Sequence, residues 1–159
     1  MALSAHPESI AALAGSLPRA RVDSVVAFFE TLSPDSLSQL GNFYMPNAWF
    51  KDPFNEVRGL AGIRAIFEHM YVALEQPRFV VTDRIIDGQQ CFLTWNFKFH
   101  FNRFNTATLQ TVRGGSHLKF TADGLIDYHR DYWDVAEELY EKLPWVGALM
   151  RWLKKRANQ

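Results

Sequence analysis

The stretch Cys91–Phe101, CFLTWNFKFHF, decides the fold of this chain. Side chains alternate between the two faces of a strand, and here apolar and polar residues alternate in the same way. The pattern therefore predicts a long strand with one buried and one solvated face. The apolar set is Cys91, Leu93, Trp95, Phe97, Phe99 and Phe101, and the polar set is Thr94, Asn96, Lys98 and His100.

Further strands are predicted on both sides of this stretch. The dipeptides Asp87-Gly88 and Asp123-Gly124 are hairpin turn signals, and Gly114-Gly115 is interpreted as a β-bulge inside a strand. Together these segments predict a four-stranded antiparallel meander. Its strands are expected at residues 79–86, 91–101, 107–120 and 125–133.

Helical periodicity dominates the chain before the meander. Pro34 separates two amphipathic runs, and Ser33 before it has the position of a helix N-cap. Helices followed by strands are the layout of an α+β domain. The expected helices cover residues 19–32, 34–43 and 60–74, with a short strand at 48–54.

Composition restricts the class of protein. The chain has 159 residues, which suits one domain, and its 17 Lys and Arg residues equal its 17 Asp and Glu residues. A nucleic-acid partner is not expected, because such proteins usually carry a basic surplus. Cys91 is the single cysteine, so no internal disulfide can form. With no secretory signal pattern and no long apolar run, a cytoplasmic location is expected.

Residues 135–159 form an amphipathic tail. Trp145, Leu149, Trp152 and Leu153 make an apolar stripe above a basic face. We expect helices that pack on the domain, across a dimer interface or over a pocket mouth. A peripheral contact with a membrane surface is the alternative for a helix of this kind.

Two segments carry a resemblance to a known family. Phe50-Lys51-Asp52-Pro53-Phe54 with Val57-Arg58-Gly59, Ile63 and Phe67 resembles the first strand and third helix of ketosteroid isomerases and SnoaL-like proteins. The segment from Ser116 to Phe120, then Asp123-Gly124 and Tyr132-Trp133-Asp134, resembles their closing strands. The resemblance covers about residues 20–134 and points to the nuclear-transport-factor-2-like superfamily.

The resemblance implies an α+β cone. Helices from the N-terminal part would pack inside a curved antiparallel sheet that encloses one apolar pocket, with extra C-terminal helices. The whole chain, 1–159, would be a single SnoaL-like domain. Residues 1–18 would be a leader helix or mobile lead-in, 19–134 the cone, and 135–159 the added helices.

The same resemblance suggests catalytic residues. Asp52 matches the general base of ketosteroid isomerases, whose oxyanion donors correspond to Phe28 or Phe29 and to Ser116 here. Phenylalanine cannot donate a hydrogen bond, so the isomerase mechanism is incomplete. SnoaL-like polyketide cyclases place an acidic residue on the last strand, which implies His129 and Asp131 on the cavity side. The alternation pattern favours the opposite face, with Ile126, Tyr128 and Tyr132 inward.

Each candidate also has a structural interpretation. Asp52 precedes Pro53 and could organise a turn, His129 could be a hydrogen-bonded core residue, and Asp131 could pair with Arg130 at the rim. No metal-ligand spacing and no phosphate-binding loop occurs, so neither a metal nor a cofactor is expected. The expected pocket residues are Phe28, Trp95, Phe97, Phe99, Ser116, Leu118, Phe120 and Trp133.

Two classes of function follow. The first is a cofactor-independent isomerase, cyclase, lyase or (de)hydratase that acts on an apolar small molecule, with Asp52, His129 and Asp131 as acid–base groups. The second is a non-catalytic binding module for a lipid or terpenoid, or a dimeric scaffold. In both cases we expect a homodimer that pairs through the outer face of the sheet.

Overall fold

The computed structural model describes residues 17–103, 106–140 and 155. The expected leader helix and the expected helices beyond residue 140 lie outside this part of the chain. The described elements, in chain order, are α2 (Arg19–Glu30), the 3-10 helix η1 (Asp35–Asn42), β1 (Tyr44–Lys51), β2 (Glu56–Arg58), α3 (Leu60–Ala73), β3 (Leu74–Asp87), β4 (Gln90–Phe101), β5 (Gln110–Phe120), β6 (Ile126–Tyr132) and α4 (Val135–Glu138).

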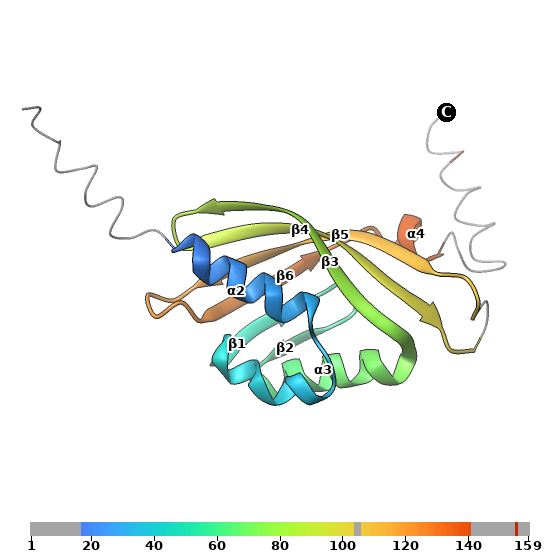
Figure 1. Cartoon of the computed structure of the whole chain (residues 1–159), viewed down its shortest axis with the longest axis horizontal. Helices are drawn as coiled ribbons and strands as arrows, with labels where there is room; N and C mark the ends of the chain where they lie inside the picture. Colours follow the sequence, from blue (N-terminus) through green and yellow to red (C-terminus); the bar gives the residue numbers. More distant parts are fainter. Residues whose placement is uncertain (1–16, 104–105, 141–154, 156–159) are drawn as a thin grey trace, which may run out of the picture.

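The α+β class and the cone are confirmed. Six strands form one curved, unclosed sheet in the order β2-β1-β6-β5-β4-β3. Figure 1 shows α2 lying across one face of this sheet, with α3 beside β1, β2 and the start of β3. α2 packs on β3, and α3 packs on β1, β2 and β3. Both long helices therefore cover the inner side of the sheet.

The meander is present as expected, because β3, β4, β5 and β6 pair antiparallel in sequence order. The early part of the sheet differs from the prediction. The second expected helix is a 3-10 helix that ends at Asn42, and β1 starts at Tyr44 instead of Ala48. β1 then pairs parallel with β6, with Phe50 opposite His129. Nothing local in the sequence predicts this pairing, which joins segments about 80 residues apart.

The β-bulge expected at Gly114-Gly115 is wrong. β4 and β5 keep a regular register there, with Trp95 opposite Gly114 and Thr94 opposite Gly115. The two glycines instead leave room for aromatic side chains of β4 to pack against β5. A Cβ on Gly114 would lie 2.8 Å from Cζ2 of Trp95, and a Cβ on Gly115 would lie 2.6 Å from Cζ of Phe92. These positions therefore let aromatic rings lie directly over β5.

One end of the cone is filled by the protein itself. The backbone N–H of Leu17 donates to the carbonyl of Gly88 at 2.8 Å, and Nε of Arg21 donates to the carbonyl of Gly124 at 2.6 Å. The start of α2 is thus fastened to both hairpin turns. We call this region the closed end. Its side chains are all 6% exposed or less: Val22, Val25, Phe28, Cys91, Leu118, Phe120 and Ile126.

Candidate functional site

An apolar pocket of about 320 Å³ occupies the opposite end of the cone, among α3, β3, β4 and the turn after β1. Its volume lies within the range typical of small-molecule sites. Four polar side chains, Asp52, Asn55, His69 and Asp131, also line it. Nine aromatic side chains supply most of the wall: Phe50, Phe54, Phe67, Phe79, Trp95, Phe97, Phe99, Phe101 and Trp133.

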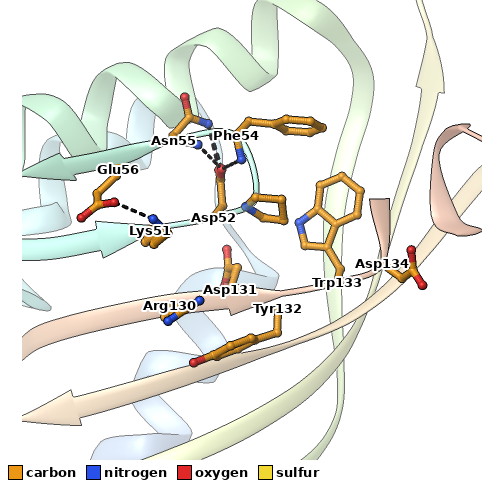
Figure 2. Close-up of a pocket in the computed structure, with 11 residues that line it drawn as sticks. Lys51, Asp52, Phe54, Asn55, Glu56, Arg130, Asp131, Tyr132, Trp133 and Asp134 are labelled. Atoms are coloured by element: carbon orange, nitrogen blue, oxygen red, sulfur yellow. Dashed lines mark hydrogen bonds and ion pairs between the residues drawn. The ribbon is translucent and has the colours of Figure 1, made fainter. Parts of the chain in front are cut away.

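A wider and more polar hollow of about 590 Å³ adjoins this pocket. Figure 2 shows it between the turn that follows β1 and the end of β6. Five residues line both spaces, namely Asp52, Phe54, Asn55, Asp131 and Trp133. We call these five residues the neck, and the polar hollow beyond them the mouth.

A third space lies deeper in the cone. It has a volume of about 20 Å³, enough for roughly one water molecule, and Phe29, Ser116, His129 and Asp131 are among its lining residues. Asp131 lines all three spaces, so its carboxylate stands where the mouth, the apolar pocket and the buried interior meet.

One arm of hydrogen bonds reaches Asp131 from β4 and β5. Nε1–H of Trp95 donates to Oγ of Ser116 at 2.8 Å, and the Ser116 hydroxyl donates to Oδ1 of Asp131 at 2.5 Å. The direction follows from chemistry, because an indole N–H can only donate. Ser116 sits opposite Asp131 in the sheet, which places the two side chains on the same face.

A second arm reaches Asp131 from the parallel strand pair. The Tyr44 hydroxyl lies 2.6 Å from Nδ1 of His129, and Nε2 of His129 lies 2.8 Å from Oδ1 of Asp131. Tyr44 is fully buried. Burial, together with the negative charge of Asp131, raises the pKa of Tyr44 well above its ordinary value. The tyrosine is therefore a neutral hydroxyl that can act as a donor.

These contacts define the tautomer of His129. If Tyr44 accepted a proton from Nδ1, its own buried O–H would have no acceptor among the described residues. Tyr44 therefore donates to Nδ1, and the ring proton lies on Nε2, which donates to Asp131. Two arms thus deliver O–H and N–H donors to the same oxygen, as an ionised carboxylate requires.

Asp52 is held differently. Its Oδ1 accepts from the backbone N–H groups of Phe54 at 2.7 Å and Asn55 at 2.6 Å, and Nδ2 of Asn55 donates to its Oδ2 at 2.9 Å. Figure 2 shows this carboxylate pointing into its own turn and away from Asp131. The turn-forming interpretation of Asp52 therefore describes its contacts, while the residue also lines the neck.

The other residues expected in the pocket divide between the two ends of the cone. Trp95, Phe97, Phe99 and Trp133 line the apolar pocket, and Ser116 lines the small inner space. Phe28, Leu118 and Phe120 are instead buried at the closed end and are absent from the described lining of these spaces. The α2 residue that lines the small inner space is the next one, Phe29.

Each of the two predictions for the inward face of β6 is correct for one part of the strand. His129 and Asp131 point inward, as the resemblance implies, while Tyr132 is exposed. Ile126 is nevertheless fully buried, as the alternation favoured. A register shift between Lys119 and Phe120 places Ile126 opposite Phe120, so the strand changes face before Tyr128.

Sequence reasoning missed Tyr44. The residue lies between the predicted helix 34–43 and the predicted strand at 48–54, and its role depends on the parallel pairing of β1 with β6.

Within the described residues no set of three or more His, Cys, Asp or Glu side chains is arranged to hold a metal ion. In the same part of the chain no helix is long and apolar enough to cross a membrane.

Comparisons with known proteins agree with the fold. TsrD from Streptomyces laurentii superposes with a TM-score of 0.65 at 20% identity, over 80% of this chain and 98% of its own. A hypothetical protein with a ketosteroid isomerase-like fold from Catenulispora acidiphila, in complex with trimethylamine, gives 0.63 at 16% identity, over 75% and 88%. TerC co-crystallised with polyporic acid gives 0.63 at 15% identity, over 74% and 93%.

At these identities the comparisons show a shared fold, and a shared fold does not by itself imply a shared activity. A search of curated proteins found no match. The model of the SnoaL-like domain matches residues 25–129, which run from the middle of α2 to His129 on β6. That span is well over half of the chain and includes Asp52, Ser116 and His129. The chain belongs to the SnoaL-like domain family.

Proposed function

We propose that this protein binds an apolar, carbonyl-bearing small molecule in its pocket. Asp131 would move a proton from one position of that molecule to another. The reaction class is a cofactor-independent isomerisation, cyclisation or elimination. The observation that carries the proposal is the position of Asp131, a carboxylate held by two buried arms at the junction of an apolar pocket and a polar mouth.

The geometry of Asp131 supports the role of a base. Both of its hydrogen bonds within the described residues end on Oδ1, so Oδ2 is the oxygen that can reach a ligand. Asp131 lines both the apolar pocket and the polar mouth, so a ligand held in the pocket lies beside this carboxylate. Asp131 would take the proton from carbon beside the carbonyl, the electron pair would move onto the carbonyl oxygen, and Asp131 would return the proton elsewhere.

The neutral His129 has a supporting role in this scheme. Its Nε2–H stabilises the Asp131 carboxylate, and Tyr44 holds the ring in the tautomer that can do so. The histidine would therefore position the base instead of touching the ligand. Asp52 would act on the ligand through its charge, because its carboxylate points into its own turn.

Small-molecule binding is also consistent with the structural neighbours. The Catenulispora protein is a complex with trimethylamine, and TerC was co-crystallised with polyporic acid. Both are small organic molecules, and they differ greatly in size. We infer that the ligand of this chain is of the same general class, with an apolar body that suits the nine aromatic side chains of the pocket.

A specific observation favours the alternative of a binding module without chemistry. The hydroxyl of Ser116 and Nε2–H of His129 are both used on Asp131, so neither points at a developing oxyanion. An enzyme with this pocket would therefore need a substrate whose C–H bond is already acidic, as between two carbonyls. If no such chemistry occurs, the pocket holds its ligand unchanged.

Hydrogen exchange at carbon tests the proposal without knowledge of the natural substrate. 2-Acetyl-1-tetralone and ethyl benzoylacetate, whose exchangeable C–H bonds lie between two carbonyls, are incubated in D₂O with the protein, and loss of their α-proton signals is followed by NMR. We expect exchange above the buffer rate for wild type and a loss of about a hundredfold or more for Asp131→Asn. Asp127→Asn on the same strand, where the residue is exposed, is the control and should behave like wild type.

Binding of the same ketones separates the two alternatives. If they bind and the exchange rate equals that of buffer, the protein is a binding module. If Asp131→Asn exchanges as fast as wild type, Asp131 is not the base.

Homodimerisation and a cytoplasmic location stay predictions. The outer face of the sheet is more aromatic than expected, since Trp49 stacks on Tyr128 with ring centroids 4.8 Å apart and the amine of Lys119 lies 4.9 Å from the Tyr128 ring. Tryptophan and tyrosine are enriched at protein interfaces. We expect a dimer by light scattering at tens of micromolar, and Tyr128→Glu should shift it toward monomer.

A further inference from the structure

The neck combines two aromatic rings with two carboxylates. The rings of Phe54 and Trp133 lie edge to face, with centroids 5.5 Å apart and planes at 75°. Asp52 and Asp131 complete the lining together with the amide of Asn55. Figure 2 shows these side chains grouped between the turn after β1 and the end of β6. The passage into the pocket is therefore both aromatic and negatively charged.

Positive side chains do not cancel this charge. The described lining of the apolar pocket contains no lysine or arginine. The mouth contains Lys51 and Arg130, but it contains four acids as well, namely Asp52, Glu56, Asp131 and Asp134. Nζ of Lys51 lies 2.5 Å from Oε2 of Glu56, and the Arg130 guanidinium lies 4.7 Å from the ring centroid of Tyr132. Lys51 therefore pairs with Glu56, outside the neck, and the acids of the mouth outnumber its two cations.

Both aspartates of the neck accept hydrogen bonds from the groups around them. Three N–H groups of the turn donate to Asp52, and a hydroxyl and an imidazole N–H donate to Asp131. These contacts place two carboxylates at the same narrow passage. An anionic ligand entering the neck would therefore face two like charges in a site partly shielded from water.

We propose that the neck binds an alkylated ammonium group, with the apolar remainder of the ligand extending into the pocket. Aromatic faces attract cations, and a trimethylated or similar ammonium loses little hydration on entering such a site. This inference rests on the proposed function only in taking the pocket as the ligand site. A cation on the ligand would also offset the missing oxyanion donor, because it stabilises negative charge on a nearby carbonyl oxygen.

Three probes of nearly equal shape test the charge preference. Benzyltrimethylammonium is the cation, 2,2-dimethylpropylbenzene is its uncharged isostere, and phenylmethanesulfonate is the anion. Each is titrated into ¹⁵N-labelled full-length protein and followed by NMR. We expect the cation to bind at least about tenfold more tightly than the isostere, and the anion to show no saturable binding.

Variants of Phe54 test whether the ring contributes. Phe54 is 57% exposed, so its replacement should leave the fold intact, and a thermal melt checks this. Phe54→Leu should weaken binding of the cation by about two- to fivefold and leave binding of the isostere almost unchanged. Phe54→Tyr keeps an aromatic face and should retain wild-type affinity. Asp131→Asn should reduce the preference for the cation over the isostere.

The outcomes distinguish this inference from the proposed function. If the uncharged isostere binds as tightly as the cation, or if Phe54→Leu and Asp131→Asn leave the preference unchanged, the ammonium site is wrong while the ligand pocket stands. If none of the three probes binds at millimolar concentration, the pocket is not a ligand site, and both proposals fail.

Discussion

The closed and open ends of the cone are built from the same strands in different ways. At the closed end α2 is fastened across both hairpin turns, and Leu118 and Phe120 of β5 are buried beneath it. At the open end β4 continues with Phe97, Phe99 and Phe101, and a hollow of about 320 Å³ is left beside them. The alternation of apolar and polar residues along the strands is similar at both ends of the cone.

This comparison shows what an apolar pattern can and cannot specify. Alternation determines which face of a strand points inward. It does not determine whether a helix covers that face closely enough to fill the space. Leu118 and Phe97 look alike in the sequence, yet one packs in a solid core and the other lines a pocket. The position of α2, set by its contacts with Gly88 and Gly124, makes the difference.

Matched leucine truncations should give the largest contrast between the two ends. Leu118 is fully buried, so Leu118→Ala leaves a new cavity and should lower the free energy of unfolding by about 2–5 kcal/mol. Leu74→Ala enlarges a pocket that already exists and should cost about 1 kcal/mol. Urea unfolding measures both. Equal losses would mean that the open end is packed like a core.

A smaller effect is expected where β5 meets the indole of Trp95. Gly114→Ala would place a methyl group against that ring, displace it, and break the hydrogen bond to Ser116. We expect a loss of about 1–3 kcal/mol in the free energy of unfolding. Gly41→Ala is the control, because its Cβ would meet Cδ1 of Leu60 at an ordinary 3.7 Å. An unchanged Trp95 side-chain NMR signal in Gly114→Ala would contradict this account.

The buried hydroxyl of Tyr44 lies between the two ends and can be removed alone. Tyr44→Phe leaves Nδ1 of His129 without its donor and should cost about 1–2 kcal/mol. The ¹⁵N shifts of the His129 ring should also change, since the tautomer is no longer held. Tyr132→Phe, at a 42% exposed position, is the control. Identical ring shifts in wild type and Tyr44→Phe would show that Tyr44 does not position His129.

The smallest effect concerns pH and the closed end. Burial raises the pKa of Cys91 from 9.0 to about 12. The unfolded chain therefore loses this proton first, and stability is lost as pH rises from about 9 toward 12. Between pH 9 and pH 10 the loss should be about 1 kcal/mol. Urea midpoints of wild type should fall over this interval more than those of Cys91→Ala, and parallel curves would disprove the assignment.

Much of the fold could be predicted because its signals are local. The meander follows from alternation and from the turns at Gly88 and Gly124, and α3 follows from helical spacing. The parallel pairing of β1 with β6 could not be predicted, because no local pattern records which distant strand becomes a neighbour. The glycines of β5 were misread for a similar reason, since the rings that pass over them belong to β4.

The candidate site was predictable only in part. His129 and Asp131 were placed on one face by their spacing and by the family resemblance, and their contact at 2.8 Å agrees with that spacing. Tyr44 could not be predicted as a site residue, because its hydrogen-bond partner is a histidine 85 positions away. That histidine lies on β6, which pairs parallel with β1. Asp52 shows the opposite case, in which the pattern of Asp before Pro correctly indicates a turn, and the structure adds its place in the neck.

The place of β6 in the sheet also bears on how the protein is made. β6 lies between β1 and β5, although it is the last of the described strands to be synthesised. Until residues 126–132 have left the ribosome, the β1–β2 hairpin has no neighbour and the other three strands have an unpaired edge. Pairings so distant in sequence form slowly, because a long loop must close first. The nascent chain would therefore expose unpaired strand edges until β6 is available, and this is the stage at which a chaperone would act.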